Sequence, residues 1–109
     1  MAARVNRGEV WMFELSPSDK RRPVLVLTRQ DAIGLLRTVI VASITSTIRG
    51  APSEVVLGID EGLKRDSAVN LDHVQTVDQS LLRRYLGSVS AAKMASVCRA
   101  LVIATGCSD

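Results

Sequence analysis

Short apolar runs alternate with polar, turn-forming segments through the first three-quarters of the chain. The runs are rich in Val, Ile and Leu, and Gly, Pro, Ser or Asp residues stand between them. Such runs predict β-strands, and their close spacing predicts a small, strongly bent sheet or barrel. The expected strands are Glu9–Leu15, Pro23–Thr28, Arg37–Ile44, Ser53–Leu57, Ser67–Leu71 with an extension over His73–Val77, and Leu86–Val89. The linkers Gln30–Leu36 and Gly58–Asp66 are predicted to be one helical turn at most and a loop, respectively.

The apolar pattern changes period towards the C-terminus. Asp78–Arg84 is predicted to form a short helix capped by its first residue. Ser90 is placed to cap a longer helix over Ala91–Thr105, where apolar residues recur at helical spacing. Val102 and Ile103 lie off that apolar stripe, so a second copy of the chain or an ordinary loop is expected to cover them.

Length and composition indicate a single domain over residues 1–109. The chain has 109 residues, of which 47% are hydrophobic, enough for one core but not for two. Only three residues are aromatic (Trp11, Phe13 and Tyr85), so we expect an aliphatic core and no platform of several stacked rings. No segment has the pattern of a signal peptide or a membrane span, and we therefore expect a cytoplasmic protein.

The charge distribution favours an anionic partner. The net charge is +3, and residues 1–50 carry eight Lys or Arg against four Asp or Glu. The chain has eleven Arg and three Lys, and the planar guanidinium suits phosphate better than an ammonium does. RNA or DNA is the usual partner of such a protein, although a small basic excess is also common on other proteins.

Several kinds of active site are excluded by the residues at hand. Cys98, Cys107 and the single His73 are too far apart in sequence for a zinc site, so we expect no metal and no cofactor. One histidine cannot form a two-histidine ribonuclease. The S-x-x-K pattern of penicillin-binding enzymes occurs at Ser90–Lys93, but its companion motifs are missing and Ser90 is needed as a helix cap.

Two segments carry chemistry that suits a phosphate. Lys20, Arg21 and Arg22 precede Pro23, which restricts Arg22 to an extended backbone at the start of a strand. Alternation along the strand that follows Arg37 places the hydroxyls at positions 43, 45 and 47 on one face. The residues alone leave a plainer interpretation open, in which the arginines form a solvated basic turn and the hydroxyls an exposed strand end.

Five segments, in this order and spacing, resemble the MazF/PemK toxin family of mRNA interferases. They are Arg7–Trp11 (RGEVW), Arg22–Val26 (RPVLV), Val39–Ser46 (VIVASITS), Asp66–Asp72 (DSAVNLD) with Thr76–Asp78 (TVD), and Leu86–Gly87. The resemblance implies a mainly β (α+β) fold, a small SH3-like β-barrel with appended helices and a C-terminal helix. It also implies a homodimer that cleaves single-stranded RNA at a short sequence motif and is neutralised by a cognate antitoxin.

The resemblance also assigns roles to individual residues. Arg22 falls on the family's catalytic arginine and Thr45 on its catalytic threonine or serine. Ser16–Arg21 is shorter and more basic than the corresponding loop of relatives, and His73 stands where many relatives have Gln. The residues expected to contact RNA are Lys20, Arg21, Ser43, Thr47, Ser67 and His73.

A metal-free mechanism fits these residue types. The ribose 2′-hydroxyl attacks the adjacent phosphorus, and the enzyme holds the reacting atoms in line and stabilises the phosphorane. Arg22 is expected to stabilise that charge, since a guanidinium does not readily lose its proton, and Thr45 to bind a phosphate oxygen or the 2′-hydroxyl. The alternatives are a CcdB-like toxin that binds DNA gyrase without catalysis, an RNA-binding module, or a decayed toxin kept as a binder.

Overall fold

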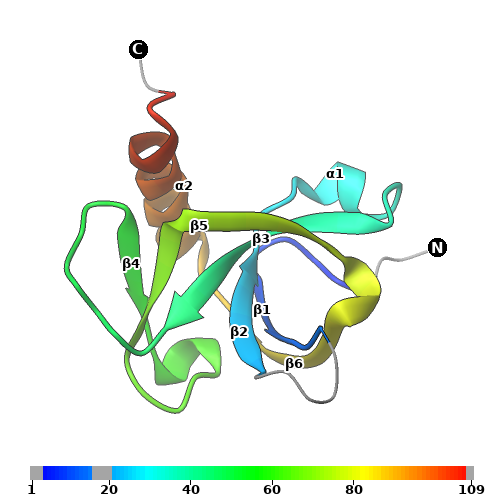
Figure 1. Ribbon diagram of the computed structural model, residues 1–109, viewed down its shortest axis with the longest axis horizontal. Coiled ribbons are helices and arrows are strands. Elements are labelled where there is room, and N and C mark those ends of the chain that lie inside the picture. Colours follow the sequence, from blue (N-terminus) through cyan, green and yellow to red (C-terminus); the bar gives the residue numbers. More distant parts are fainter. Residues whose placement is uncertain (1–3, 16–20, 108–109) are drawn as a thin grey trace.

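The computed structural model describes residues 4–15 and 21–107. The strands form one six-stranded sheet in the order β4-β5-β3-β2-β1-β6, and every neighbouring pair is antiparallel. The sheet is strongly curled (Figure 1). The strands are β1 (Glu9–Phe13), β2 (Arg22–Val26), β3 (Thr38–Thr45), β4 (Glu54–Leu57), β5 (Ser67–Asp78) and β6 (Leu82–Ser88). The helical elements are α1 (Gln30–Ile33), η1 (Ile59–Glu61), η2 (Gln79–Leu81) and α2 (Ala91–Thr105).

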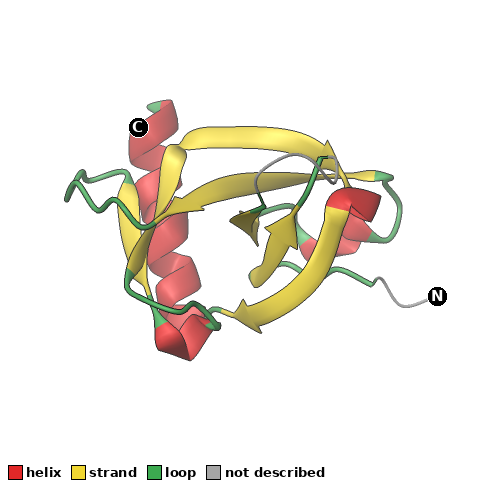
Figure 2. Cartoon of the chain, turned by 60° about the horizontal axis from the view of Figure 1, so that its bottom comes forward, coloured by secondary structure: helices red, strands yellow, loops and turns green. Residues whose placement is uncertain are grey.

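Apolar side chains on both faces of the sheet form two core clusters. One cluster joins Leu25 and Ile44 to Val97 and Ala100 of α2, which packs against β4 and β5 at one end of the sheet (Figure 2). The other lies inside the curl and is built from aliphatic residues of β2, β3 and β5 around Trp11. The mainly aliphatic core expected from the composition is therefore confirmed.

β5 is much longer than its neighbours and bends at a bulge. Ala42 of β3 pairs with Val74, but the next residue, Ser43, pairs with Asn70, so residues 71–73 have no partner on β3. An insertion of this kind bends the strand and redirects its side chains. The two halves of β5 consequently serve different parts of the sheet, and the bulge lies between them.

α2 begins and ends where the sequence indicates. The Ser90 hydroxyl accepts a hydrogen bond from the backbone N–H of Lys93 at 3.1 Å, which satisfies one of the free donors of the first turn. Gly106 ends the helix with φ +69°, a left-handed conformation that favours glycine. Val102 and Ile103 are 37% and 55% exposed, so the described residues of the same chain cover them only in part.

The loop that carries η1 touches β6 across the open edge of the sheet. Gly62, at φ +87°, and Gly87 lie so close that a Cβ on Gly62 would overlap the carbonyl oxygen of Leu86. Only glycine allows two backbones to approach in this way. The contact brings the β4 end of the sheet next to its β6 end.

The mainly β fold with appended helices and a C-terminal helix is confirmed. Two expectations need correction. Among the described residues β4 and β6 do not pair, so the sheet is strongly curled but is not a closed barrel. Asp78 does cap a helical segment, by accepting from the N–H of Ser80, but that segment ends at Leu81 and β6 begins at Leu82, where Phe13 of β1 pairs with it. Strand pairing there overrides the local helical pattern.

Candidate functional site

A pocket of about 480 Å³ lies where β2, β3, β4 and the bulge of β5 meet. We name it the arginine pocket, because Arg22 and Arg49 are the two cationic groups among its described lining residues. Hydroxyl, amide, carboxylate and imidazole groups complete a strongly polar lining. Its residues are Arg22, Ser43, Ile44, Thr45, Thr47, Arg49, Ala51, Glu54, Asn70, Asp72 and His73.

Strand pairing brings the two expected catalytic residues together. The antiparallel pairing of β2 with β3 runs from Val26 opposite Val41 to Val24 opposite Ser43, and Arg22 and Thr45 lie two positions beyond that last pair on their strands. Both residues are therefore at the same end of the two strands, and both line the pocket although 22 residues separate them in sequence.

Backbone hydrogen bonding orients the Thr45 hydroxyl. Its Oγ1 accepts a hydrogen bond from the N–H of Thr47 at 3.1 Å, at the point where β3 ends. A hydroxyl that already accepts one bond still has its proton to donate. Thr45 is thus prepared to donate a hydrogen bond to an anionic oxygen that enters the pocket.

A carboxylate holds the loop between β3 and β4 in place. Oε1 of Glu54 accepts hydrogen bonds from the backbone N–H groups of Arg49, Gly50 and Ala51, at 3.1, 2.9 and 3.4 Å. Because the loop backbone is fixed at Arg49, the guanidinium of that residue is carried to the rim of the pocket. Glu54 acts here as a backbone clamp.

The bulge of β5 is fixed by polar side chains. Asn70 Oδ1 accepts from the N–H of Asp72 at 2.9 Å, and Asp72 Oδ2 accepts from the Ser53 hydroxyl at 2.6 Å. These bonds replace the strand pairing that residues 71–73 lack and keep His73 at the pocket wall. The wall therefore has a defined shape before any ligand binds.

Within the described part of the protein, the two arginines of the pocket form no ion pair. Arg22 is exposed, and its side chain makes no hydrogen bond or ion pair with any other described residue. Glu54 and Asp72 each spend one carboxylate oxygen on internal hydrogen bonds. The arrangement suits an anion that brings its own negative charge, such as a phosphodiester.

The structure brings most, but not all, of the expected site residues together. Arg22, Ser43, Thr45, Thr47 and His73 all line the pocket. Arg21 lies outside its lining and pairs with Glu14, with Nε and Oε2 3.3 Å apart. The expected RNA contact Ser67 is 6% exposed, and its hydroxyl donates to the carbonyl oxygen of Arg65, so it lies outside the pocket as well. Lys20 lies outside the described residues.

Four polar or charged residues of the pocket were not found from the sequence. Arg49 follows the hydroxyl run closely, and a search for cations beyond the strand end would have found it. Asn70 and Asp72 are polar residues two apart within an apolar strand pattern, which is a signal for an exposed strand face or a bulge. Glu54 carried no signal, because its role depends on the shape of the preceding loop.

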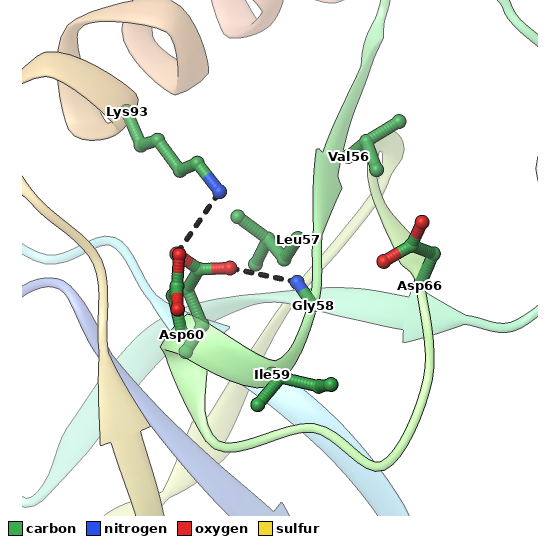
Figure 3. Close-up of a pocket in the computed structure, with 8 residues that line it drawn as sticks. Val56, Leu57, Gly58, Ile59, Asp60, Asp66 and Lys93 are labelled. Atoms are coloured by element: carbon green, nitrogen blue, oxygen red, sulfur yellow. Dashed lines mark hydrogen bonds and ion pairs between the residues drawn. The ribbon is translucent and has the colours of Figure 1, made fainter.

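A second pocket, of about 260 Å³, lies between η1 and the start of α2, and we name it the helix pocket (Figure 3). Glu61, only 3% exposed, binds the Lys93 ammonium at 3.0 Å and accepts from the N–H of Gly58 at 2.7 Å. Burial raises the pKa of Glu61, but the hydrogen bonds from Gly58 and Lys93 and the charge of Lys93 outweigh it and leave that pKa below its ordinary value. The acid is therefore held ionised and paired.

Neither pocket offers a ligand set for a metal. Within residues 4–15 and 21–107, no three His, Cys, Asp or Glu side chains are arranged to hold an ion. No helix among the described residues is both long and apolar enough to cross a membrane, and the longest, α2, has 15 residues.

Comparison with known proteins identifies the chain. Residues 6–105 match the family described as PemK-like, MazF-like toxin of type II toxin-antitoxin system. The chain is 47% identical to the probable endoribonuclease MazF5 of Mycobacterium tuberculosis, with 99% of each chain covered. The probable endoribonuclease MazF2 of the same species is 36% identical, over 94% of this chain and 100% of that protein.

Solved structures agree with this result. The M. tuberculosis toxin MazF-mt6 superposes with a TM-score of 0.82 at 35% identity, covering 90% of this chain and 96% of the other. A mycobacterial endoribonuclease in complex with its cognate antitoxin gives a TM-score of 0.85 at 28% identity, covering 96% and 98%. The resemblance noted in the sequence is confirmed, and this chain belongs to the family of PemK-like and MazF-like toxins of type II toxin–antitoxin systems.

Proposed function

We propose that this protein is a toxin endoribonuclease that cuts single-stranded RNA at a short sequence motif, without a metal ion, in the arginine pocket. The presence of Arg22 and Thr45 in one pocket, at the same end of the paired strands β2 and β3, carries the proposal. A guanidinium that stays charged beside a hydroxyl with a proton to donate can bind two non-bridging oxygens of one phosphodiester. Membership of a family in which relatives are named endoribonucleases supports the same activity.

The reaction needs no nucleophile from the protein. The ribose 2′-oxygen attacks the neighbouring phosphorus and displaces the 5′-oxygen, which leaves a 2′,3′-cyclic phosphate and a 5′-hydroxyl end. Arg22 stabilises the negative charge that develops on the phosphorane, and Thr45 fixes a phosphate oxygen or the 2′-hydroxyl. Ser43, Thr47 and Arg49, which line the same pocket, hold the flanking nucleotides.

The partners follow from the surface and from the relatives. We propose a homodimer in which the exposed Val102 and Ile103 of α2 are covered by the second copy. We also propose a cognate antitoxin that neutralises the toxin in the cytoplasm. Its existence is supported by solved complexes of relatives with antitoxins, among them MazE–MazF from Deinococcus radiodurans at 26% identity and a TM-score of 0.78.

The experiment that tests the proposal maps the ends of cut RNA. Purified protein is incubated with a long RNA in excess chelator, and the products are examined for 5′-hydroxyl and 2′,3′-cyclic phosphate ends. We expect cuts at one short motif, and none where the ribose at the cut site is replaced by deoxyribose. Activity that is lost in chelator and restored by Mg²⁺ would overturn the metal-free mechanism, and intact RNA under all conditions would favour a non-catalytic toxin.

A further inference from the structure

We propose that His73 is the general acid of the cleavage reaction and donates a proton to the 5′-oxygen as it leaves. This inference rests on the proposed ribonuclease activity and adds a residue to it. Arg22 and Thr45 account for charge stabilisation and positioning, but neither is suited to supply that proton. A guanidinium keeps its protons under all physiological conditions, and an aliphatic hydroxyl is a very weak acid.

The fold places an imidazole at the site. His73 is the last of the three unpaired residues in the β5 bulge, and it lines the same pocket as Arg22 and Thr45. The hydrogen bonds of Asp72 with Asn70 and Ser53 fix the backbone immediately before it. His73 is exposed, and its side chain forms no hydrogen bond with another residue of the described chain, so no internal contact explains its position.

Other charged groups face His73 from each element around the pocket. Arg22 comes from β2, Arg49 from the loop after β3, Glu54 from β4, and Asp72 from β5 itself. α2 also packs against β5, but none of its residues is among those that line this pocket. Among the described lining residues, His73 supplies the imidazole, and histidine is the side chain used most often as a general acid or base.

In the proposed step, one bond forms and one bond breaks at the same phosphorus. The 2′-oxygen forms a bond to phosphorus, and the bond between phosphorus and the 5′-oxygen breaks with its electron pair remaining on that oxygen. The imidazolium of His73 passes a ring N–H proton to it, giving the 5′-hydroxyl product and a neutral imidazole. The proton of the 2′-hydroxyl leaves to water, and solvent returns one proton to His73 before the next turnover.

A second role for the same side chain makes a different prediction. If His73 only attracts or hydrogen-bonds the RNA, replacing it should change binding and should affect all substrates equally. A general acid matters only when the leaving group needs a proton. An RNA with sulfur in place of the 5′-bridging oxygen distinguishes the two roles, because a thiolate leaves without protonation.

The test compares wild-type protein with His73→Gln and His73→Lys on a short RNA that carries the mapped cut site. On ordinary RNA we expect kcat of His73→Gln to fall by roughly 10²–10⁴-fold. On the 5′-sulfur RNA both proteins should cut within about threefold of each other. Binding of uncleavable 2′-deoxy RNA, measured at pH 8, and thermal unfolding should change little.

Three results would overturn the assignment. They are an unchanged kcat in His73→Gln, an equal loss on the oxygen and sulfur substrates, and full rescue by His73→Lys, which keeps a cation. A wild-type protein that cuts neither RNA would overturn the proposed function as well. If the wild-type protein cuts both RNAs and one of the three results above is found, only the role of His73 is refuted.

Discussion

The arginine pocket and the helix pocket treat charge in opposite ways. In the helix pocket, the buried Glu61 is matched by Lys93 and by the backbone of Gly58, so the acid is satisfied within the chain. In the arginine pocket, the Glu54 carboxylate accepts from loop backbone and the Asp72 carboxylate from the Ser53 hydroxyl, while Arg22 faces solvent without a described partner. In the helix pocket, polar groups join η1 to α2. In the arginine pocket, polar groups position the loop and the bulge that surround the arginines.

The difference indicates which polar groups maintain the fold and which wait for a ligand. Glu61 and Lys93 connect η1 to the first turn of α2, so their removal should be felt in folding. Arg22 stabilises nothing described within the protein, so its removal should be felt in function. Each of the following variants tests whether the two regions are separable in this way.

The largest effect is expected for Arg22→Ala. If the guanidinium stabilises charge that develops in the transition state, cleavage should slow by roughly 10²–10³-fold. Affinity for uncleavable RNA should fall much less, because other cations keep most of the phosphate attraction. Single-turnover rates and equilibrium binding on the same RNA measure the two effects separately.

Arg29→Ala is the matched control for Arg22→Ala. Arg29 is exposed and pairs with the exposed Asp31, with 3.2 Å between Nε and Oδ1. The Arg29→Ala substitution therefore removes one positive charge, as Arg22→Ala does, but at a position outside the pocket. Its cleavage rate and melting temperature should stay close to those of the wild type. An Arg22→Ala protein that cuts at the wild-type rate would refute the assignment and make Arg49, the other arginine that lines the pocket, the next candidate.

Thr45→Ala should produce a loss no larger than that of Arg22→Ala. Both side chains line the same pocket, so they should clamp one phosphate together. The double variant should then lose less than the product of the two single losses. Strictly multiplicative losses would show that the two side chains act at independent points of the reaction.

In the helix pocket, Lys93→Met should destabilise the fold without slowing cleavage. It leaves the carboxylate of Glu61 buried without its cation, which costs about 1–3 kcal/mol. Because the Lys93 side chain is 39% exposed, solvent screening places the expected loss in the lower half of that range. Denaturant unfolding measures the change, and Lys64→Met, which removes an exposed lysine, should lie within about 0.5 kcal/mol of the wild type.

The Lys93→Met variant also tests how the free energy of unfolding depends on pH. The pKa of Glu61 is lowered in the folded protein, so the unfolded chain takes up the proton first as the solution is acidified. The pair therefore stabilises the fold fully above about pH 5 and loses this effect as the pH falls through about 4 and below. The stability gap between wild type and Lys93→Met should narrow over that interval. A gap that widens on acidification would show that Glu61 is not the group held by Lys93.

The sequence predicted those features that depend on local pattern. Ser90 and Gly106 mark the ends of a helix by their own chemistry, and the apolar runs identify β1 to β5 with small errors at the ends. The positions of Arg22 and Thr45 were also accessible, because the resemblance to the toxin family covers both segments. Their placement at the same end of two paired strands was not, since it depends on the register between β2 and β3.

The features that were missed depend on contacts between distant segments. The segment after Asp78 has a helical pattern, but pairing with β1 turns Leu82–Ser88 into a strand. The bulge that brings Asp72 and His73 to the pocket depends on how β5 pairs with β3. Ser67 was expected near the RNA because of its place in a motif, but strand alternation turns its side chain away from the pocket. None of these outcomes is encoded within a single segment.

The smallest effect is expected for Arg49→Gln. This variant tests whether Arg49 contributes to RNA binding while Arg22 contributes to cleavage. Arg49 stands at the rim, on a loop that Glu54 holds through backbone N–H groups, so a glutamine can keep that loop intact. If Arg49 contacts one phosphate away from the cut, RNA binding should weaken by only a few-fold at moderate salt. The slope of log K against log salt should become shallower by about 0.7, the value for one contact to a single strand. The cleavage rate at saturating RNA should stay near that of the wild type, in contrast to Arg22→Ala. An unchanged salt slope together with a large loss in rate would place Arg49 at the reacting phosphate and divide the transition-state charge between two arginines.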